Sequence, residues 1–254
     1  MAKKSRKENK KSLHHRSGNI VHPVFDDLSH STGWHPLDGE IDACRDKKYV
    51  KNITPRSDGQ RELMDAMNEK NLTLAIGPAG TGKTYLAISA AVEALENGQV
   101  DRIILSRPAM EAGESLGYLP GDMNEKMAPY LRPLYDAMGD RLGGKKVRQY
   151  MDEGAIEIAP VGFMRGRTLN NAFVVIDEAQ NCTYGQLKML LSRLGWHSTM
   201  VVTGDPEQSD LLDGMSGLAD IADRLERVSN IGVVRLKQKD IVRHPLVAEM
   251  LEVL

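Results

Sequence analysis

The feature that most constrains this chain is the glycine-rich segment Gly77-Pro78-Ala79-Gly80-Thr81-Gly82-Lys83-Thr84. It follows the apolar run 72–76 and precedes an alanine-rich stretch, 84–95, whose periodicity predicts a helix. Glycines let backbone N–H groups approach an anion, and the positive end of the following helix points to the same place. The segment therefore predicts a phosphate-binding loop. The alternative, a glycine-rich turn without a ligand, is disfavoured by this context.

Separate roles are expected for the residues of this loop. Lys83 is expected to neutralise the β and γ phosphates of ATP, and the Thr84 hydroxyl to ligate Mg²⁺. Upstream, Gln60 is a candidate reader of the adenine edge, with an exposed helix glutamine as the alternative. The candidate nucleotide-binding residues are Gln60, Gly77, Pro78, Ala79, Gly80, Thr81, Gly82, Lys83, Thr84 and Tyr85.

An acid pair follows a second apolar run, 173–176. In open α/β sheets, ligands bind at the carboxyl ends of the strands. Asp177 is expected to hold the water shell of Mg²⁺, and Glu178 to orient or deprotonate the water that attacks the γ-phosphate. Since a phosphotransferase has to keep water out, this pair favours hydrolysis. The alternative is a strand end with two solvated acids.

A third apolar run, 200–202, leads into Thr203-Gly204-Asp205-Pro206-Glu207-Gln208. Gly-Asp-Pro by itself is a common turn signal. Its position after a strand, however, predicts that Gln208 lies near the phosphates. There a neutral amide could sense the γ-phosphate or position the attacking water.

The chain from about residue 51 alternates between strand and helix patterns. A helix is expected at 60–68, and strands at 72–76, 102–105, 156–159, 173–176, 200–202 and 231–234. This alternation predicts an α/β fold with a parallel sheet and helices on both faces. We expect two parts: a flexible, basic and histidine-rich segment at 1–50, and one ATPase domain at 51–254.

Charge is distributed unevenly along the chain. The formal net charge is −2, yet residues 1–16 carry about +6 and the remainder about −8. A basic arm on an acidic body can contact nucleic-acid phosphates, and the alternative is a solvated, disordered tail. Five of the seven histidines fall before residue 36, at scattered spacings that do not favour a metal site.

Composition indicates a cytoplasmic protein without a membrane partner. No stretch approaches the roughly 20 apolar residues of a membrane helix, and no apolar segment follows the basic N-terminus as in a secretory signal. The two cysteines, Cys44 and Cys182, lie far apart, which fits a reduced compartment.

Together, the motifs resemble the PhoH family of phosphate-starvation-inducible ATPases, which share the core of superfamily 1 helicases. The resemblance runs from about Thr54 to the C-terminus. Besides the motifs above it rests on the segments 85–87, 106–108, 113–121, 129–136, 165–169, 177–181, 204–211 and 240–247. Cys182 departs from the pattern, where a threonine is more usual.

The resemblance implies a RecA-like P-loop NTPase that acts on nucleic acid, with RNA-directed helicase activity, in a ring-shaped homo-oligomer that we expect to be a hexamer. Single-stranded RNA is then a more suitable partner than DNA. Some relatives carry a PIN-type nuclease domain in front. The segment 1–50 is short and polar, so we expect no nuclease domain here.

Superfamily 1 enzymes place the nucleotide between two RecA-like domains, the second of which supplies an arginine. After Gly204-Asp205 only about 50 residues remain, too few for such a domain. The arginine is therefore expected from another copy of the chain, and Arg243, just before Pro245, is the candidate. The alternative is an arginine that covers a helix N-terminus or pairs with Asp240.

Nucleic-acid contacts are expected between the core strands. The candidates are Arg107, Lys126, Arg132, Arg165 and Arg167, with Tyr118, Tyr130 and Phe163 as possible stacking faces. Apolar residues repeat at helical spacing in the same region and favour a buried or intersubunit stripe: Leu119, Met123, Met127, Tyr130, Leu134 and Met138.

Three classes of function stay open at this point. The favoured one is an ATPase stimulated by nucleic acid. The second is an ATP-driven switch or remodelling factor that acts on a protein and ignores RNA. The third is a small-molecule kinase, which Glu178 and Gln208 disfavour because both are suited to handling water.

Overall fold

The computed structural model describes residues 53–108, 123–212, 214–242 and 250, with side chains from 131 onward in the second range. Within these ranges six parallel strands form one sheet, in the order β3-β2-β4-β5-β1-β6. The strands are β1 Leu72–Ile76, β2 Arg102–Ser106, β3 Ile156–Ile158, β4 Ala172–Ile176, β5 Thr199–Gly204 and β6 Ile231–Arg235. The predicted leader, 1–50, lies outside the described residues.

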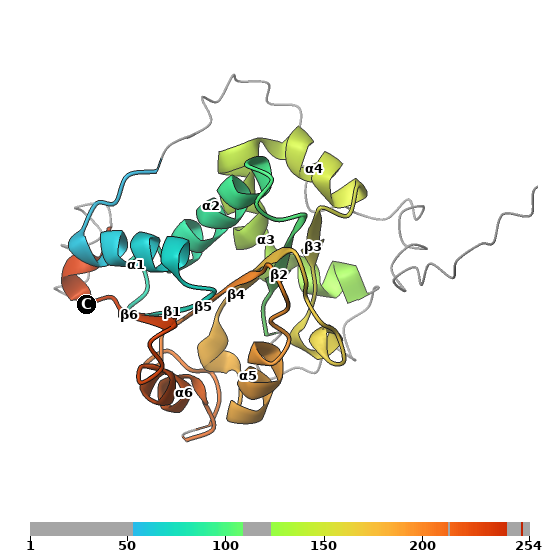
Figure 1. Ribbon diagram of the computed structural model, residues 1–254. Coiled ribbons are helices and arrows are strands. Elements are labelled where there is room, and N and C mark those ends of the chain that lie inside the picture. Colours follow the sequence, from blue (N-terminus) through green and yellow to red (C-terminus); the bar gives the residue numbers. More distant parts are fainter. Residues whose placement is uncertain (1–52, 109–122, 213, 243–249, 251–254) are drawn as a thin grey trace, which may run out of the picture. The chain divides into compact units, whose positions relative to one another are not determined.

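Helices cover both faces of the sheet (Figure 1). On one face lie α1 Asp58–Glu69, α2 Lys83–Glu96, α3 Met123–Leu142 and α4 Gly144–Asp152, and on the other lie α5 Tyr184–Leu191 and α6 Leu218–Leu225. Three short 3₁₀ helices complete the described part: η3 Val161–Met164, η4 Ala179–Asn181 and η5 Gln238–Asp240. No helix among the described residues is long and apolar enough to cross a membrane.

Side chains along the central strands point alternately into two apolar cores, one on each face of the sheet. Leu74 and Val174 point into the core beneath α5 and α6, whereas their neighbours Ala75 and Val175 point into the core beneath α1 to α4. Successive side chains of a strand face opposite sides of its sheet, so a strand covered on both faces is expected to be mostly apolar. β1 and β4 are buried along their whole length, and the one polar residue among them, Thr73, donates its hydroxyl to the Ala66 carbonyl at 3.2 Å.

The sequence-based fold class is confirmed. Each predicted strand lies within two residues of an observed one, and the predicted helices 60–68 and 84–95 correspond to α1 and α2. In α3, Leu134 and Met138 of the predicted apolar stripe are fully buried, while the side chains of its other members lie outside the described residues. Because all six strands are parallel, the loops that follow β1, β2, β4 and β5 meet at one edge of the sheet.

Candidate functional site

A cavity of about 290 Å³ opens at this edge, between the glycine loop and the carboxyl ends of β4 and β5. It is lined by Ala79, Gly80, Gly82, Lys83, Thr84, Tyr85, Asp177, Glu178, Gly204, Asp205 and Gln208. The N-cap of α2 is Gly82, in a left-handed conformation at φ 84°. Glycine has no side chain to cap the first turn, so the N–H groups of that turn remain available to an anion.

Lys83 lies folded back on its own loop. Its ammonium donates hydrogen bonds to the carbonyl oxygens of Gly77 at 2.6 Å and Pro78 at 2.8 Å, and the residue is 8% exposed. Burial lowers the pKa of Lys83 below its ordinary value, although the nearby carboxylates of Asp205, Glu178 and Asp177 oppose that shift. A phosphate in the cavity would supply the anionic partner that favours the charged ammonium.

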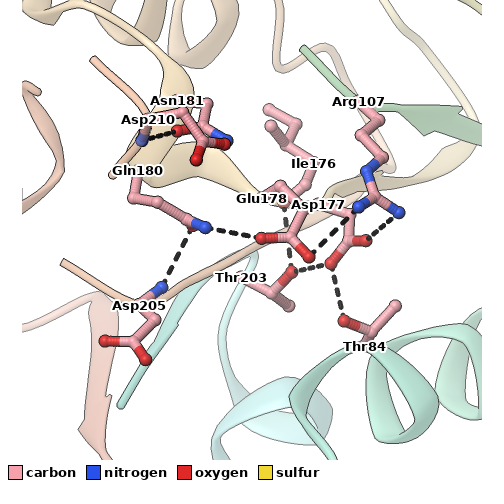
Figure 2. Close-up of polar contacts among 10 residues, drawn as sticks. All are labelled: Thr84, Arg107, Ile176, Asp177, Glu178, Gln180, Asn181, Thr203, Asp205 and Asp210. Carbon is pink, nitrogen blue, oxygen red and sulfur yellow. Dashed lines mark hydrogen bonds and ion pairs between the residues drawn. The ribbon is translucent and has the colours of Figure 1, made fainter. Parts of the chain in front are cut away.

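Two hydroxyls converge on Asp177 at the end of β4 (Figure 2). Thr84 and Thr203 each donate a hydrogen bond to Asp177 Oδ1, both at 2.6 Å, and Asp177 is 3% exposed. A hydroxyl and a carboxylate are oxygen donors of the kind that Mg²⁺ takes from a protein, while water and substrate phosphates complete its shell. Thr84 and Asp177 therefore fit the predicted metal site.

Glu178 follows Asp177 in a left-handed backbone conformation, φ 53° and ψ 41°, which is uncommon for a residue with a side chain. Its Oε1 accepts a hydrogen bond from Arg107 Nη2 at 3.3 Å, and its Oε2 accepts one from Gln180 Nε2 at 2.5 Å. Arg107 Nη1 also lies 3.7 Å from Asp177 Oδ2. The acid pair is thus held by a guanidinium on one side and an amide on the other (Figure 2).

The loop after β5 is joined to the loop after β4. The Asp205 N–H donates to Gln180 Oε1 at 3.1 Å. Asn181 and Asp210 exchange two hydrogen bonds, from Asn181 Nδ2 to Asp210 Oδ2 at 2.9 Å and from the Asp210 N–H to Asn181 Oδ1 at 2.8 Å. These contacts set the position of the turn that carries Gln208, which lines the cavity as predicted.

Gln60 is buried, so the alternative of an exposed helix glutamine is wrong. Its amide nitrogen donates to the Thr81 carbonyl at 3.0 Å, and its amide oxygen accepts from the Arg56 N–H at 2.8 Å. The side chain therefore supports the glycine loop from behind. A contact with adenine stays a prediction.

The segment after β6 also reaches the glycine loop. The Val242 N–H donates to the Gly80 carbonyl at 2.9 Å. The Asp240 side chain is buried beside Gly59 and accepts from the Lys237 N–H at 2.8 Å, which holds the pKa of Asp240 below its ordinary value. Arg243 itself lies outside the described residues, so its predicted role stays a prediction.

The basic residues proposed for nucleic-acid contact lie in different settings. Arg107 is at the acid pair, and Arg167 makes two hydrogen bonds to Glu157. Arg132 and Arg165 are exposed, and the side chain of Lys126 lies outside the described residues. The side chain of Phe163, in η3, is 48% exposed. None of these observations tests a contact with nucleic acid.

Sequence reasoning missed three parts of this site: the second hydroxyl on Asp177, from Thr203; the amide of Gln180, which joins Glu178 to Asp205; and the contact of Arg107 with the acids. A signal was present for each residue, because all three are polar and lie within four residues of the carboxyl end of a buried strand. Which strands are neighbours could not be deduced from it.

Comparison with known proteins identifies relatives of this chain. The sequence profile of the family described as "PhoH-like protein" matches residues 52–254. A PhoH-like protein of Bacillus subtilis (strain 168) is 55% identical over 80% of this chain and 64% of its own length. Protein PhoH of Escherichia coli (strain K12) is 45% identical over 81% of this chain and 59% of its own. The chain thus spans about three fifths of these relatives, and the resemblance seen in the motifs is confirmed.

Similar solved structures are more distant. The large terminase of a thermophilic bacteriophage has a TM-score of 0.48 at 12% identity and covers 78% of this chain and 50% of its own. The SWI2/SNF2 ATPase core of Sulfolobus solfataricus, in complex with dsDNA, has a TM-score of 0.47 at 13% identity and covers 82% and 53%. Similarity at this level says nothing about activity.

Proposed function

We propose that this chain, which belongs to the PhoH family, hydrolyses ATP with Mg²⁺ and couples hydrolysis to the binding of single-stranded nucleic acid, with RNA favoured over DNA, for unwinding or translocation. The cavity supports the hydrolytic part, because Lys83, Thr84, Asp177 and Glu178 line the same space. The observation that carries it is Glu178, a carboxylate in the phosphate cavity directly beside the Thr84–Asp177 pair.

Each residue has one step in this scheme. The loop N–H groups and Lys83 bind the β and γ phosphates. Glu178 accepts a proton from the attacking water, and Gln208 orients that water with its amide. Mg²⁺, held by Thr84 and through the water shell on Asp177, would draw charge from the transferring phosphoryl group. The same residues disfavour a kinase, which has to exclude the water that Glu178 is placed to activate.

The nucleic-acid part is supported by the resemblance to a family with RNA-directed helicase activity and by the exposed Arg132 and Arg165. ATP turnover, measured without a strand, with single-stranded RNA and with single-stranded DNA of the same length, tests it. We expect stimulation by both strands, more by RNA. Turnover that ignores both strands would contradict the coupling and favour the remodelling ATPase that acts on a protein.

We further propose that the active site is shared between copies in a homo-oligomeric ring, as a hexamer, with Arg243 reaching the γ-phosphate of the neighbouring copy. A transition-state arginine is worth a factor of about 10³–10⁵ in rate. A contact within the chain supports a role for this segment at the nucleotide, since Val242 already touches the glycine loop. That contact also favours the alternative in which Arg243 serves its own loop, and the two are separated by the mixing experiment below.

A further inference from the structure

The contact between Arg107 and Glu178 is built by the sheet itself. β2 pairs with β4 in a register that sets Ser106 against Ile176, and the Asp177 N–H donates to the Ser106 carbonyl at 2.8 Å. Arg107 directly follows Ser106, and Glu178 directly follows Asp177, so both come immediately after this last hydrogen bond between the two strands. The pairing of the strands therefore brings the guanidinium onto the acid pair (Figure 2).

Glu178, which lines the cavity, is held from two sides, and Arg107 is one of its two partners. One carboxylate oxygen accepts from Arg107 and the other from Gln180. Each carboxylate oxygen thus has a protein partner, and the two partners together orient the Glu178 side chain.

The Arg107 contact is suited to exchange. Its side chain is 19% exposed and that of Glu178 is 37% exposed, and the two contacts with the acids measure 3.3 and 3.7 Å. Ion pairs that water can reach contribute little, and a guanidinium binds a phosphate with a matching, two-pronged geometry. Arg167 differs, because it already makes two hydrogen bonds to the single carboxylate of Glu157.

We propose that Arg107 restrains Glu178 until a phosphate of a bound single strand takes the guanidinium and so releases the carboxylate to activate water. This inference rests on the proposed function, because it names how a strand would stimulate turnover. Glu178 and the strand then compete for one side chain. By reciprocity, whatever weakens the hold of Glu178 on Arg107 has to strengthen strand binding.

The first test needs no hydrolysis. Strand affinity is measured by fluorescence anisotropy without nucleotide, using a labelled single-stranded RNA of mixed sequence. Glu178→Gln removes the charge that competes for Arg107, so we expect tighter binding by a factor on the order of 5 or more. That gain should vanish in the double variant Glu178→Gln/Arg107→Ala. A gain that persists without Arg107 would overturn the proposal.

A matched control separates this competition from a general change of charge. Asp205→Asn removes a negative charge from the same cavity, but the Asp205 carboxylate acts on Lys83. Any gain it brings should be the same with and without Arg107. The slope of log affinity against log salt should fall by about 0.7 in Arg107→Ala, the value for one lost phosphate contact on a single strand. An unchanged slope would contradict contact with the strand.

The second test follows turnover. Arg107→Ala should raise the strand-free rate and bring the ratio of stimulated to basal rate near one, and Arg107→Lys should fall between it and the wild type. As a control, Lys146→Ala breaks the ion pair with Glu96 on α2 and α4, far along α2 from the loop, and should change neither rate. The restraint would be overturned if Arg107→Ala hydrolyses ATP without a strand at or below the wild-type rate. This conclusion requires that its nucleotide affinity and its free energy of unfolding equal those of the wild type.

These outcomes also separate the inference from the proposed function. If the wild-type protein neither binds a strand nor responds to one, the coupling to nucleic acid fails. The restraint is then still decided by the strand-free rate of Arg107→Ala. If the wild type responds to a strand but Arg107→Ala responds equally, the coupling stands and this account of it is wrong.

Discussion

At the scale of single residues, the environment of Lys83 decides how the site meets a phosphate. The ammonium is nearly buried and, in the chain as described, its hydrogen bonds go to two carbonyl oxygens of its own loop. Burial outweighs the three carboxylates and lowers its pKa. A phosphate favours the charged form, so nucleotide binding and protonation of Lys83 reinforce each other.

A pH dependence follows from that shift. In the free protein Lys83 loses its proton at a lower pH than an exposed lysine, whose pKa is 10.5. Bound phosphates are expected to raise its pKa again, because a nearby anion favours the charged ammonium. Between the two values, binding has to take up a proton, so nucleotide affinity should fall as the pH rises through that window. Isothermal calorimetry between pH 7.5 and pH 10, in buffers that differ in ionisation enthalpy, measures this uptake.

Lys83→Arg is the control for this prediction, because a guanidinium stays charged over the whole range. The nucleotide affinity of Lys83→Arg should not change with pH over the range in which that of the wild type falls, whatever its absolute value. The same fall in both proteins would place the titrating group elsewhere.

The acid and the lysine should fail in different ways when replaced. Glu178→Gln keeps the shape of the site and removes the base, so we expect nucleotide affinity to be retained and single-turnover hydrolysis to fall by about 10²–10⁴-fold. Lys83→Ala should lose affinity as well, since the phosphates lose their compensating charge. Hydrolysis near the wild-type rate in Glu178→Gln would show that another residue activates the water.

At the scale of elements, the site depends on loops held against one another. The loops after β4 and β5 are joined by Gln180 and by the Asn181–Asp210 pair. The loop after β1 starts at Gly77, whose N–H donates to the Gly204 carbonyl at 3.2 Å. A Cβ on Gly77 would lie 2.3 Å from the carbonyl oxygen of Leu236, the residue directly after β6, so the backbone there approaches this loop as closely as glycine allows.

Gly77→Ala should therefore be costly. The residue has φ 144°, and the added methyl group meets backbone that cannot turn aside. We expect a loss of at least about 3 kcal/mol in the free energy of unfolding by urea, from strain and overpacking together. Gly98→Ala is the control, since Gly98 also has a positive φ, 66°, but open space around it, and should cost only about 1–2 kcal/mol. Equal losses in the two variants would contradict the steric argument.

At the scale of the whole molecule, the described residues form one sheet, and the cavity of the candidate site opens at its edge. It spans 64% of the Bacillus subtilis relative and 59% of the Escherichia coli one, so the activity of those longer proteins extends to it only as a proposal. The segment that leads to Arg243 passes the glycine loop of its own chain, which makes the choice between own and neighbouring site an experimental one.

Mixing two inactive variants decides between them. Arg243→Ala should bind ATP without turning over, as should Glu178→Gln. In a mixed ring some interfaces join an intact Glu178 to an intact Arg243 of the next copy, so activity should partly return. Turnover per subunit should also rise with protein concentration through the range of assembly, followed by light scattering. No recovery after demonstrated subunit exchange would indicate either an arginine that acts within its own chain or concerted hydrolysis that tolerates no inactive subunit. Recovery while the variants stay monomeric would exclude a shared site.

The sequence by itself determined the local chemistry. The glycines, Lys83 and Thr84 of segment 77–84 are close in sequence and therefore close in space, so their grouping could be predicted. The same holds for the two acids that directly follow 173–176. The apolar runs likewise predicted the strands, because burial on both faces of a sheet favours apolar side chains along most of each strand. These predictions agree with β1, α2 and β4 as observed.

Only the tertiary structure decided which distant residues meet. Arg107 reaches Glu178 because β2 lies beside β4, and Thr203 reaches Asp177 because β5 lies on the other side of β4. Gln60 is buried because α1 packs behind the glycine loop. The order of strands in a sheet arises from how whole helices cover its faces, which is a balance of long-range packing and chain connection. A pattern of a few residues does not encode that balance, so the partners of Asp177 and Glu178 could be identified only from the fold.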